Sequence, residues 1–115
     1  MAYIALIVED VIINKWEITE EVVILGRSKD CDIRIDDQSV SSKHARILIE
    51  PDPFLDGNKL LFIEDLKSTN GTELNGKPVV KEKLNDGDGL KIGFTQFQFV
   101  NNNNNNLDET AVILS

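Results

Sequence analysis

Hydrophobic residues along the chain occur in short runs separated by turn-forming residues. Residues 33–35 and 97–99 alternate between apolar and polar side chains with a period of two, which is the pattern of a strand with one buried face. The dipeptide Asn75-Gly76 favours a tight hairpin turn, and residues 86–89 (Asp-Gly-Asp-Gly) indicate another sharp turn. No stretch of ten residues has a helical period. The pattern predicts strands at residues 3–8, 15–18, 21–25, 33–35, 45–50, 60–65, 73–74, 77–80, 90–92 and 96–100.

The spacing of these strands also predicts the domain organisation. Many short strands within about 100 residues are typical of a β-sandwich. Residues 101–106 are six consecutive asparagines, and a polar homopolymer buries no apolar surface. We therefore expect an all-β sandwich domain over residues 1–100, followed by a disordered Asn-rich linker or tail over residues 101–115.

The charge balance excludes several classes of function. The chain has 12 Lys and Arg against 20 Asp and Glu, a formal net charge of −8. An acidic surface argues against nucleic-acid partners and against docking on anionic membranes. One cysteine and one histidine argue against a metal site. The first apolar run, at residues 3–8, is too short to span a bilayer and has no basic leader, so we expect a cytoplasmic protein.

Three loop segments between the expected strands carry the candidate chemistry. They are residues 26–28 (Gly-Arg-Ser), 41–45 (Ser-Ser-Lys-His-Ala) and 65–72 (Asp-Leu-Lys-Ser-Thr-Asn-Gly-Thr). Taken singly, each has an ordinary interpretation as a solvated charge or a turn. Taken together, they offer a guanidinium, hydroxyl groups and an amide, which are the groups that bind a phosphate.

The order and spacing of these motifs resemble the forkhead-associated (FHA) domain. The match consists of Gly26-Arg27, Ser41-x-x-His44, and residues 68–72 followed by Asn75-Gly76. The joint match of three separated motifs is specific. It implies an eleven-stranded β-sandwich in two sheets whose loops at one end bind phosphothreonine peptides, with no enzymatic activity, no cofactor and no metal.

The resemblance also implies roles for individual residues. Arg27 would grip the phosphate and Ser41 would donate its hydroxyl to it. Thr69 would line the phosphothreonine pocket, Asn70 would hydrogen-bond the peptide backbone, and Asn75 would orient a neighbouring loop. The remaining peptide-binding candidates are Ser42 and Lys43.

Three further residues are implied to be structural. Gly26 and Gly71 are expected where a side chain would obstruct the loop. His44 is expected to hold the binding loops together rather than to act as a catalytic base. One position departs from the family, because many members have a basic or amide residue where this chain has Ser42. That departure predicts a less positive pocket.

The tail contains a candidate ligand of its own. Thr110 follows two acidic residues and has Ile113 three positions later, and many FHA domains select the residue at that +3 position. Phosphorylated Thr110 would therefore resemble an FHA ligand, with binding to a second copy easier than binding within one chain. The alternative interpretation is that these tail residues are simply the start of a following segment.

We therefore expect a phosphothreonine-binding module that recognises a Ser/Thr kinase substrate, with a preference for an aliphatic residue at +3 and with phosphorylation-dependent self-association. The alternative is an FHA-like scaffold or oligomerisation domain that binds its partner independently of phosphate.

Overall fold

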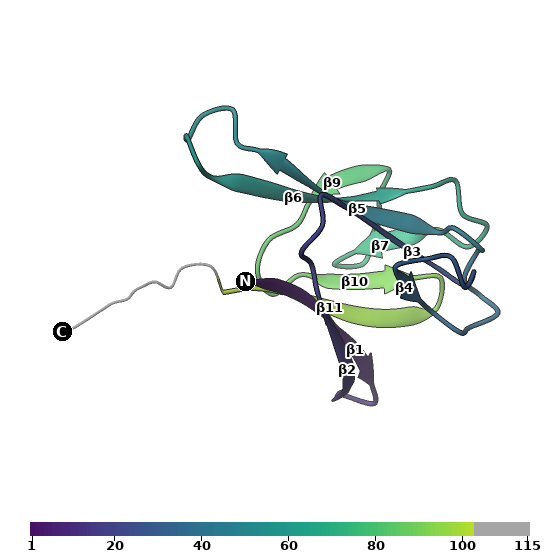
Figure 1. The fold of residues 1–115 in the computed structure, drawn as a ribbon. Helices are drawn as coiled ribbons and strands as arrows, with labels where there is room; N and C mark the ends of the chain where they lie inside the picture. The colour runs from purple at the N-terminus through teal and green to yellow at the C-terminus, as the bar shows by residue number, and fades with distance from the viewer. Residues whose placement is uncertain (103–115) are drawn as a thin grey trace.

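The computed structural model describes residues 1–102, which form two packed β-sheets (Figure 1). Among these residues no helix is long and apolar enough to cross a membrane. The eleven strands are β1 (Ala2–Val8), β2 (Val11–Glu17), β3 (Val22–Gly26), β4 (Ile33–Arg34), β5 (Ala45–Pro51), β6 (Lys59–Asp65), β7 (Thr72–Leu74), β8 (Lys77–Pro78), β9 (Lys81–Lys83), β10 (Gly89–Ile92) and β11 (Thr95–Asn101).

The two sheets divide these strands unequally. One sheet has six strands in the order β2-β1-β11-β10-β7-β8, and the other has five in the order β4-β3-β5-β6-β9. All pairings given by the register are antiparallel except the short parallel pair of β3 and β4. The predicted eleven-stranded sandwich in two sheets is therefore confirmed.

The core lies between the sheets and takes aliphatic and aromatic side chains from both. Ile4 and Phe99 come from the larger sheet, and Leu25, Ile47 and Ile63 come from the smaller sheet; all five are fully buried. Each follows the inward half of its strand's alternating pattern, as the period of two predicts. Packing of the core determines the positions of the strand ends, and the strand ends determine the positions of the loops.

Every predicted strand overlaps an observed one, but three segments differ. The strand β9 was not predicted, because its sequence Lys-Glu-Lys has no apolar residue and all three side chains are exposed. The predicted strand at 77–80 ends at Pro78. The strand β2 begins at Val11, four residues before the predicted start. Its first residues form an exposed hairpin with β1 and show no alternation in burial.

The predicted hairpin turn at Asn75-Gly76 is confirmed by its backbone. Asn75 has a φ of 52° and Gly76 a φ of 85°. Positive φ at both central positions is the requirement of a type I′ turn, which joins β7 to β8.

A buried histidine ties together the loops at one end of the sandwich. His44 is fully buried just before β5. Its Nδ1 accepts a hydrogen bond from the backbone N–H of Ser41 at 3.0 Å. Its Nε2 lies 2.8 Å from the backbone oxygen of Gly71 and donates to it, since Nδ1 is the acceptor. The imidazole therefore joins the β4–β5 connection to the β6–β7 connection.

Asp65, at the end of β6, organises the second of these connections. Its carboxylate accepts hydrogen bonds from the Ser68 hydroxyl at 2.5 Å, the Ser68 N–H at 3.1 Å and the Thr72 hydroxyl at 2.7 Å. Burial by itself raises the pKa of Asp65, but these hydrogen bonds and the nearby His44 together hold the pKa below its ordinary value. The ionised carboxylate therefore stabilises the β6–β7 loop.

The lowered pKa of Asp65 predicts a pH dependence of stability. The folded pKa lies below the unfolded pKa of about 3.9, so the stabilisation is present above that unfolded value and is lost as the pH falls through the folded pKa. We expect the urea-unfolding free energy to fall between about pH 5 and pH 2, and to fall less steeply in Asp65→Asn. Asp56→Asn, in the exposed β5–β6 turn, should keep the wild-type slope. Equal slopes in wild type and Asp65→Asn would contradict this assignment.

We also expect His44→Ala to lower the free energy of unfolding by about 2–4 kcal/mol, because it opens a cavity and leaves the Ser41 N–H and the Gly71 carbonyl without their partner. Urea unfolding followed by tryptophan fluorescence measures this loss. Ser42→Ala, which removes an exposed hydroxyl nearby, should change stability by less than about 0.5 kcal/mol. A His44→Ala variant as stable as wild type would show that the bridge is dispensable.

Candidate functional site

The three loops singled out in the sequence meet at one end of the sandwich. Arg27 directly follows β3, Ser41 lies before β5, and Thr69 lies between β6 and β7. The N–H of Arg27 donates to the Ser41 carbonyl at 3.0 Å, and the N–H of Ser28 donates to the Ser42 carbonyl at 3.1 Å. The N–H of Thr69 donates to Ser41 Oγ at 3.1 Å. The structure therefore brings Arg27, Ser41 and Thr69 together, through a backbone hydrogen bond between the first two and through the Ser41 hydroxyl between the last two.

The contact with Thr69 decides what the Ser41 hydroxyl can do. Ser41 Oγ accepts from a backbone N–H, so its own proton is left to donate elsewhere. The Ser41 side chain is half-buried, and Thr69 is exposed beside it. An anion that approaches this end of the sandwich meets a hydroxyl donor already held in place.

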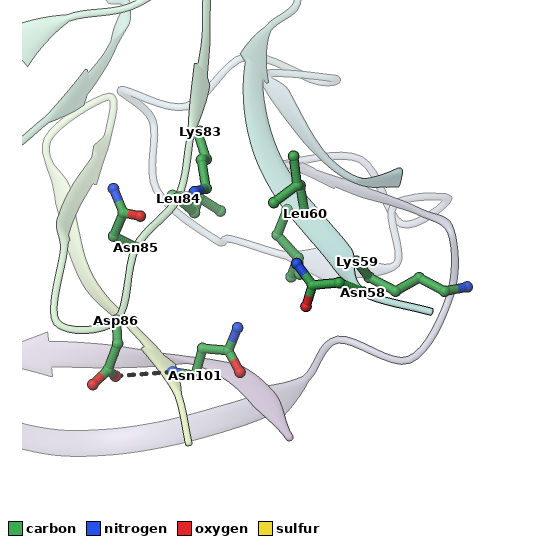
Figure 2. A pocket seen from close by; sticks show the side chains of 9 residues that line it. Asn58, Lys59, Leu60, Lys83, Leu84, Asn85, Asp86 and Asn101 are labelled. Atoms are coloured by element: carbon green, nitrogen blue, oxygen red, sulfur yellow. Dashed lines mark hydrogen bonds between the residues drawn. The ribbon is translucent and has the colours of Figure 1, made fainter. Parts of the chain in front are cut away.

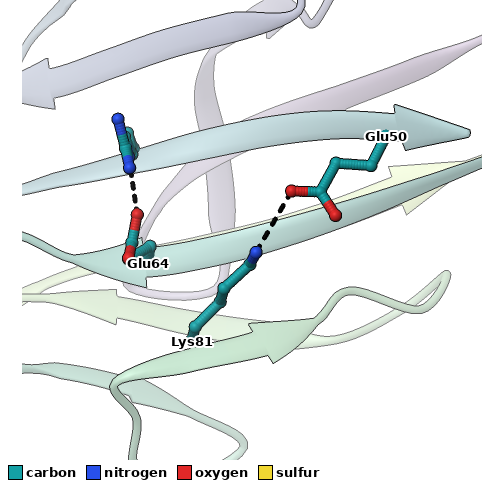
Figure 3. A network of polar contacts seen from close by, with 4 residues as sticks. Glu50, Glu64 and Lys81 are labelled. Atoms are coloured by element: carbon teal, nitrogen blue, oxygen red, sulfur yellow. Dashed lines mark hydrogen bonds and ion pairs between the residues drawn. The ribbon is translucent and has the colours of Figure 1, made fainter.

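Of the twelve Lys and Arg residues, all of which lie within residues 1–102, three form ion pairs, and two of those three are arginines. In the described part of the chain, the ion pairs are Arg34–Asp36 at 3.7 Å, Arg46–Glu64 at 2.6 Å and Lys81–Glu50 at 3.1 Å. The last two lie on the outer face of the smaller sheet (Figure 3). Neither Arg27 nor Lys43 has an acidic partner among residues 1–102, and both are exposed.

Asn70 lies next to Thr69 and is anchored through one end of its amide. Its Nδ2 donates to the Ser39 carbonyl at 2.8 Å, which ties the β6–β7 loop to the β4–β5 loop a second time. The side-chain oxygen has no hydrogen-bond donor within residues 1–102. An amide held in this way presents an acceptor for a peptide N–H.

The two structural glycines are required for different reasons. A Cβ at Gly26 would lie 2.2 Å from the Ser42 carbonyl oxygen, so a side chain there would separate the first two loops. A Cβ at Gly71 would meet nothing within 4 Å. The expectation of an obstructed side chain is wrong for Gly71. Its φ of 83° makes glycine the favoured residue instead.

The structure adds a fourth loop that the sequence did not single out. Phe94, in the β10–β11 turn, donates its N–H to Ser39 Oγ at 2.9 Å, and its side chain is 68% exposed. Ser39 Oγ in turn donates to Asp37 at 2.6 Å, and the hydrogen bonds from Ser39 hold the pKa of Asp37 below its ordinary value. In the sequence, this loop is marked by the pair Gly93-Phe94 after the predicted strand 90–92. Such a pair has the composition of an ordinary turn, so it did not indicate a binding loop.

The remaining predicted residues lie in different places. Ser42 and Lys43 are exposed beside Ser41. Asn75 lies away from the three loops: its amide donates to Asp88 at 2.9 Å and accepts from the Gly89 N–H at 2.8 Å, which joins the β7–β8 turn to the start of β10. Thr110 lies outside the described residues.

Two other features are separate from this chemistry. Burial raises the pKa of the Cys31 thiol, which donates to the Ser42 carbonyl at 3.1 Å and so is packed beneath the loops rather than activated. A hollow of about 230 Å³ lies elsewhere, between the start of β6 and the β9–β10 connection (Figure 2). Its lining includes Lys59, Lys83 and Asp86 and none of the predicted site residues.

Comparison with known proteins identifies the domain. The FHA domain model matches residues 23–93. FhaA of Mycobacterium tuberculosis, an FHA domain-containing protein, is 33% identical over 81 residues, which cover 70% of this chain and 14% of FhaA. The probable serine/threonine-protein kinase fhkA of Dictyostelium discoideum is 44% identical over 80 residues, covering 64% of this chain and 13% of the kinase. The glycogen accumulation regulator GarA of Mycolicibacterium smegmatis is 36% identical over 87 residues, covering 76% and 51%. The chain therefore spans at most about half the length of these relatives.

Solved structures agree with the family match. One, from a study of phosphothreonine-dependent FHA domain interactions, has a TM-score of 0.73 at 30% identity and covers 87% of this chain and 95% of its own. The FHA domain of FhaA, solved in complex with the intracellular domain of another protein, has a TM-score of 0.71 at 30% identity, with 86% and 99% coverage. The sandwich, the arrangement of its loops and these matches lead to one conclusion: the chain belongs to the FHA domain family.

Proposed function

We propose that this chain is a phosphothreonine-binding module that recruits phosphorylated proteins and catalyses no reaction. The observation that carries the proposal is the state of Arg27. Of the three arginines, all within residues 1–102, Arg27 alone has no ion pair, although the chain has a net charge of −8. Its backbone N–H is bonded to the carbonyl of Ser41, the residue whose hydroxyl is held by Thr69. A phosphate dianion is the ligand that such a cluster suits.

The energetics favour a strict dependence on phosphate. Each charge-assisted hydrogen bond contributes about 1.5–3 kcal/mol, and Arg27, Ser41 and Thr69 offer several of them. Two such bonds correspond to roughly a hundredfold or more in affinity. We therefore expect the unphosphorylated form of a ligand to bind at least about a hundredfold more weakly than the phosphorylated form.

The relatives support a phosphorylated protein as the partner. The solved FHA domain studied for phosphothreonine-dependent interactions and the FhaA complex each share 30% identity with this chain. We infer that the ligand here is the phosphorylated substrate of a Ser/Thr kinase in the cytoplasm. The departure at Ser42 leaves a hydroxyl where a cation or amide is common, which lowers the local positive potential.

The exposed ring of Phe94 supports selection of an aliphatic residue at +3. It is 68% exposed, and its backbone is bonded to the loop that holds Ser41. Lys91 Nζ lies 5.7 Å from the ring centroid, so one part of the ring contacts a cation while the rest offers apolar surface. A ligand that runs from the Arg27 side towards the β10–β11 turn would place a downstream side chain against this ring.

Two other readings fit the geometry less well. A hydrolytic mechanism would need His44 as a base, but both of its ring nitrogens are bonded to backbone groups and the imidazole is fully buried. A phosphate-independent scaffold would have no use for an arginine without an acidic partner beside an oriented hydroxyl.

The decisive variant is Arg27→Ala. We expect it to lower the affinity for phosphothreonine peptides at least about a hundredfold, because the bidentate phosphate contact is lost. Fluorescence anisotropy with a degenerate phosphothreonine peptide library measures this loss. Arg46→Ala removes a guanidinium that is already paired with Glu64 and should keep full affinity. Undiminished phosphopeptide binding by a folded Arg27→Ala variant would overturn the proposal.

We further propose that phosphorylated Thr110 is a ligand for a second copy. The binding loops lie at the end of the sandwich away from Asn101, so a chain that leaves after β11 has to run back along a strand of about 20 Å and around the loops to reach its own Arg27. A second copy imposes no such path. The acids before Thr110 and Ile113 at +3 fit the site described above.

A peptide titration tests this self-association. We expect peptide 107–115 to bind the full chain when Thr110 is phosphorylated, and to bind at least tenfold more weakly with phosphoserine or unmodified threonine at that position. Sedimentation of the Thr110-phosphorylated chain should show an increase in mass that Arg27→Ala removes. If no form of the peptide binds while other phosphothreonine peptides do, the ligand is foreign and the self-association proposal fails.

A further inference from the structure

The four sheet edges of the described sandwich are protected to very different degrees. The edge strand β4 has two residues, β8 has two residues and includes Pro78, and β9 consists of three charged residues. These are the devices by which proteins prevent an edge from pairing with another strand. The edge strand β2 has seven residues and no proline; its charged residues, Lys15 and Glu17, lie in its second half, and its first three residues are apolar.

The sequence of β2 adds to this exposure. Val11, Ile12 and Ile13 are 56%, 53% and 58% exposed. A register shift opposite Leu6 and Ile7 marks a bulge in the pairing of β1 with β2, and the hairpin projects from the rest of the sandwich (Figure 1). Three consecutive exposed aliphatic residues on a free edge form a template for an added strand.

A hollow lies beneath the same hairpin. It has a volume of about 450 Å³ and takes apolar lining from both strands of the hairpin and from the core side: Leu6, Val8, Ile13, Trp16, Ile35 and Phe97. An extended segment on the edge of β2 would place alternate side chains towards this hollow. The edge supplies backbone hydrogen-bonding groups and the hollow supplies apolar contacts.

One segment of the chain outside the described residues matches this surface. Residues 111–114 are Ala-Val-Ile-Leu, an uncharged run rich in β-branched residues that follows the asparagines. Such a run has a high propensity for a strand. Its lack of charge also suits a hollow whose charged border consists of the ion pair Arg34–Asp36 and of Asp37, which is hydrogen-bonded to Ser39.

The path from the sandwich to this edge is short. Asn101 pairs with Ala2, the N–H of Asn102 donates to the Met1 carbonyl, and Tyr3 pairs with Glu17. The chain therefore leaves the sandwich at the Glu17 end of β2, two strands from the free edge. A segment that turns back there and runs along β2 is antiparallel to it, which is the orientation that a short connection allows.

The linker length fits this path. Reaching residues Val11–Ile13 from the Glu17 end of β2 needs about 14 Å across three strand spacings and about 15 Å along the strand, or roughly 20 Å in all. Nine extended residues span about 30 Å, and a flexible chain of that length averages about 17 Å. A tether of this kind gives an effective concentration in the millimolar range, so even a weak strand contact is populated.

We propose that residues 111–114 add to the free edge of β2 within the same chain, as a twelfth strand that covers Val11–Ile13. The proposal rests on the edge and the hollow and is independent of phosphate binding. It has a consequence for the tail, because a docked segment withholds Thr110 and Ile113 from a second copy.

Amide hydrogen exchange of the unphosphorylated full chain tests this docking. The substituted chain carries Val112→Asp and Ile113→Asp, and the matched control carries Asn104→Asp and Asn105→Asp, which adds the same charge without removing an apolar residue. We expect the outward-facing β2 amides to exchange at least about tenfold faster in the first variant than in wild type or the control. The amides of Arg27 and Thr69 should be unchanged. Both substitutions lie outside the sandwich and leave its core intact.

A second pair of variants tests the edge itself. Ile12→Lys should release the tail, seen as faster exchange of amides 111–114, whereas Val22→Lys, which changes an exposed aliphatic residue of β3, should not. Protection of β2 that rises with protein concentration and a doubled mass would place the tail or β2 of a second copy on this edge, and would overturn the proposal. Equally fast exchange of β2 in all variants would also overturn it. Arg27→Ala leaves this experiment unaffected, so its outcome is separable from that of the phosphopeptide test.

Discussion

The buried imidazole of His44 is the constraint on which the binding end of the molecule depends. Its two ring nitrogens accept from Ser41 and donate to Gly71, residues that belong to different connections of the sandwich. Neither contact uses a side chain of the partner, so the imidazole fixes the two loops through their backbones. The Ser41 hydroxyl adds a link of its own by accepting from the Thr69 N–H, and its proton is still left to donate. A site for a small anion needs such preorganised donors, because they are held in place before the ligand arrives.

Two carboxylates near the binding loops accept hydrogen bonds within their own loops. Asp65 accepts from the hydroxyls of Ser68 and Thr72, and Asp37 accepts from the hydroxyl of Ser39. Acids committed to their own loops do not reach across to Arg27. An acidic chain can therefore keep one arginine without an ion pair, and the hydrogen bonds that lower the pKa of these acids also stabilise the loop conformations.

Much of this arrangement could be predicted from the sequence, although each loop motif taken singly has an ordinary interpretation as a solvated charge or a turn. The order and spacing of the three motifs together, which resemble the FHA domain, are what predicted that Arg27, Ser41 and Thr69 act at one site. Asn75 was expected to orient a neighbouring loop, but which segment it contacts could not be predicted, because its hydrogen bonds with Asp88 and Gly89 depend on a pairing of β7 with β10 that no local pattern indicates. Phe94 was missed because a Gly-Phe turn carries no signal until Ser39 is seen to bind it. The strand β9 was missed because its strand character comes from pairing with β6 and not from apolar residues.

The exposed start of β2 was missed for the opposite reason. Val11, Ile12 and Ile13 have the composition of a strand, but a run of three apolar residues that are all exposed gives no alternation, and local composition does not reveal an absent partner. The other edges are shortened, charged or closed by proline. On β2 the charged residues Lys15 and Glu17 leave the apolar residues Val11–Ile13 uncovered, so this part of the edge requires an explanation of its own. Because β11 ends beside the start of β1, the chain leaves the sandwich two strands from this edge, at the end away from the binding loops. The topology thus separates two surfaces: loops suited to a ligand brought by another molecule, and an edge within reach of the chain's own continuation.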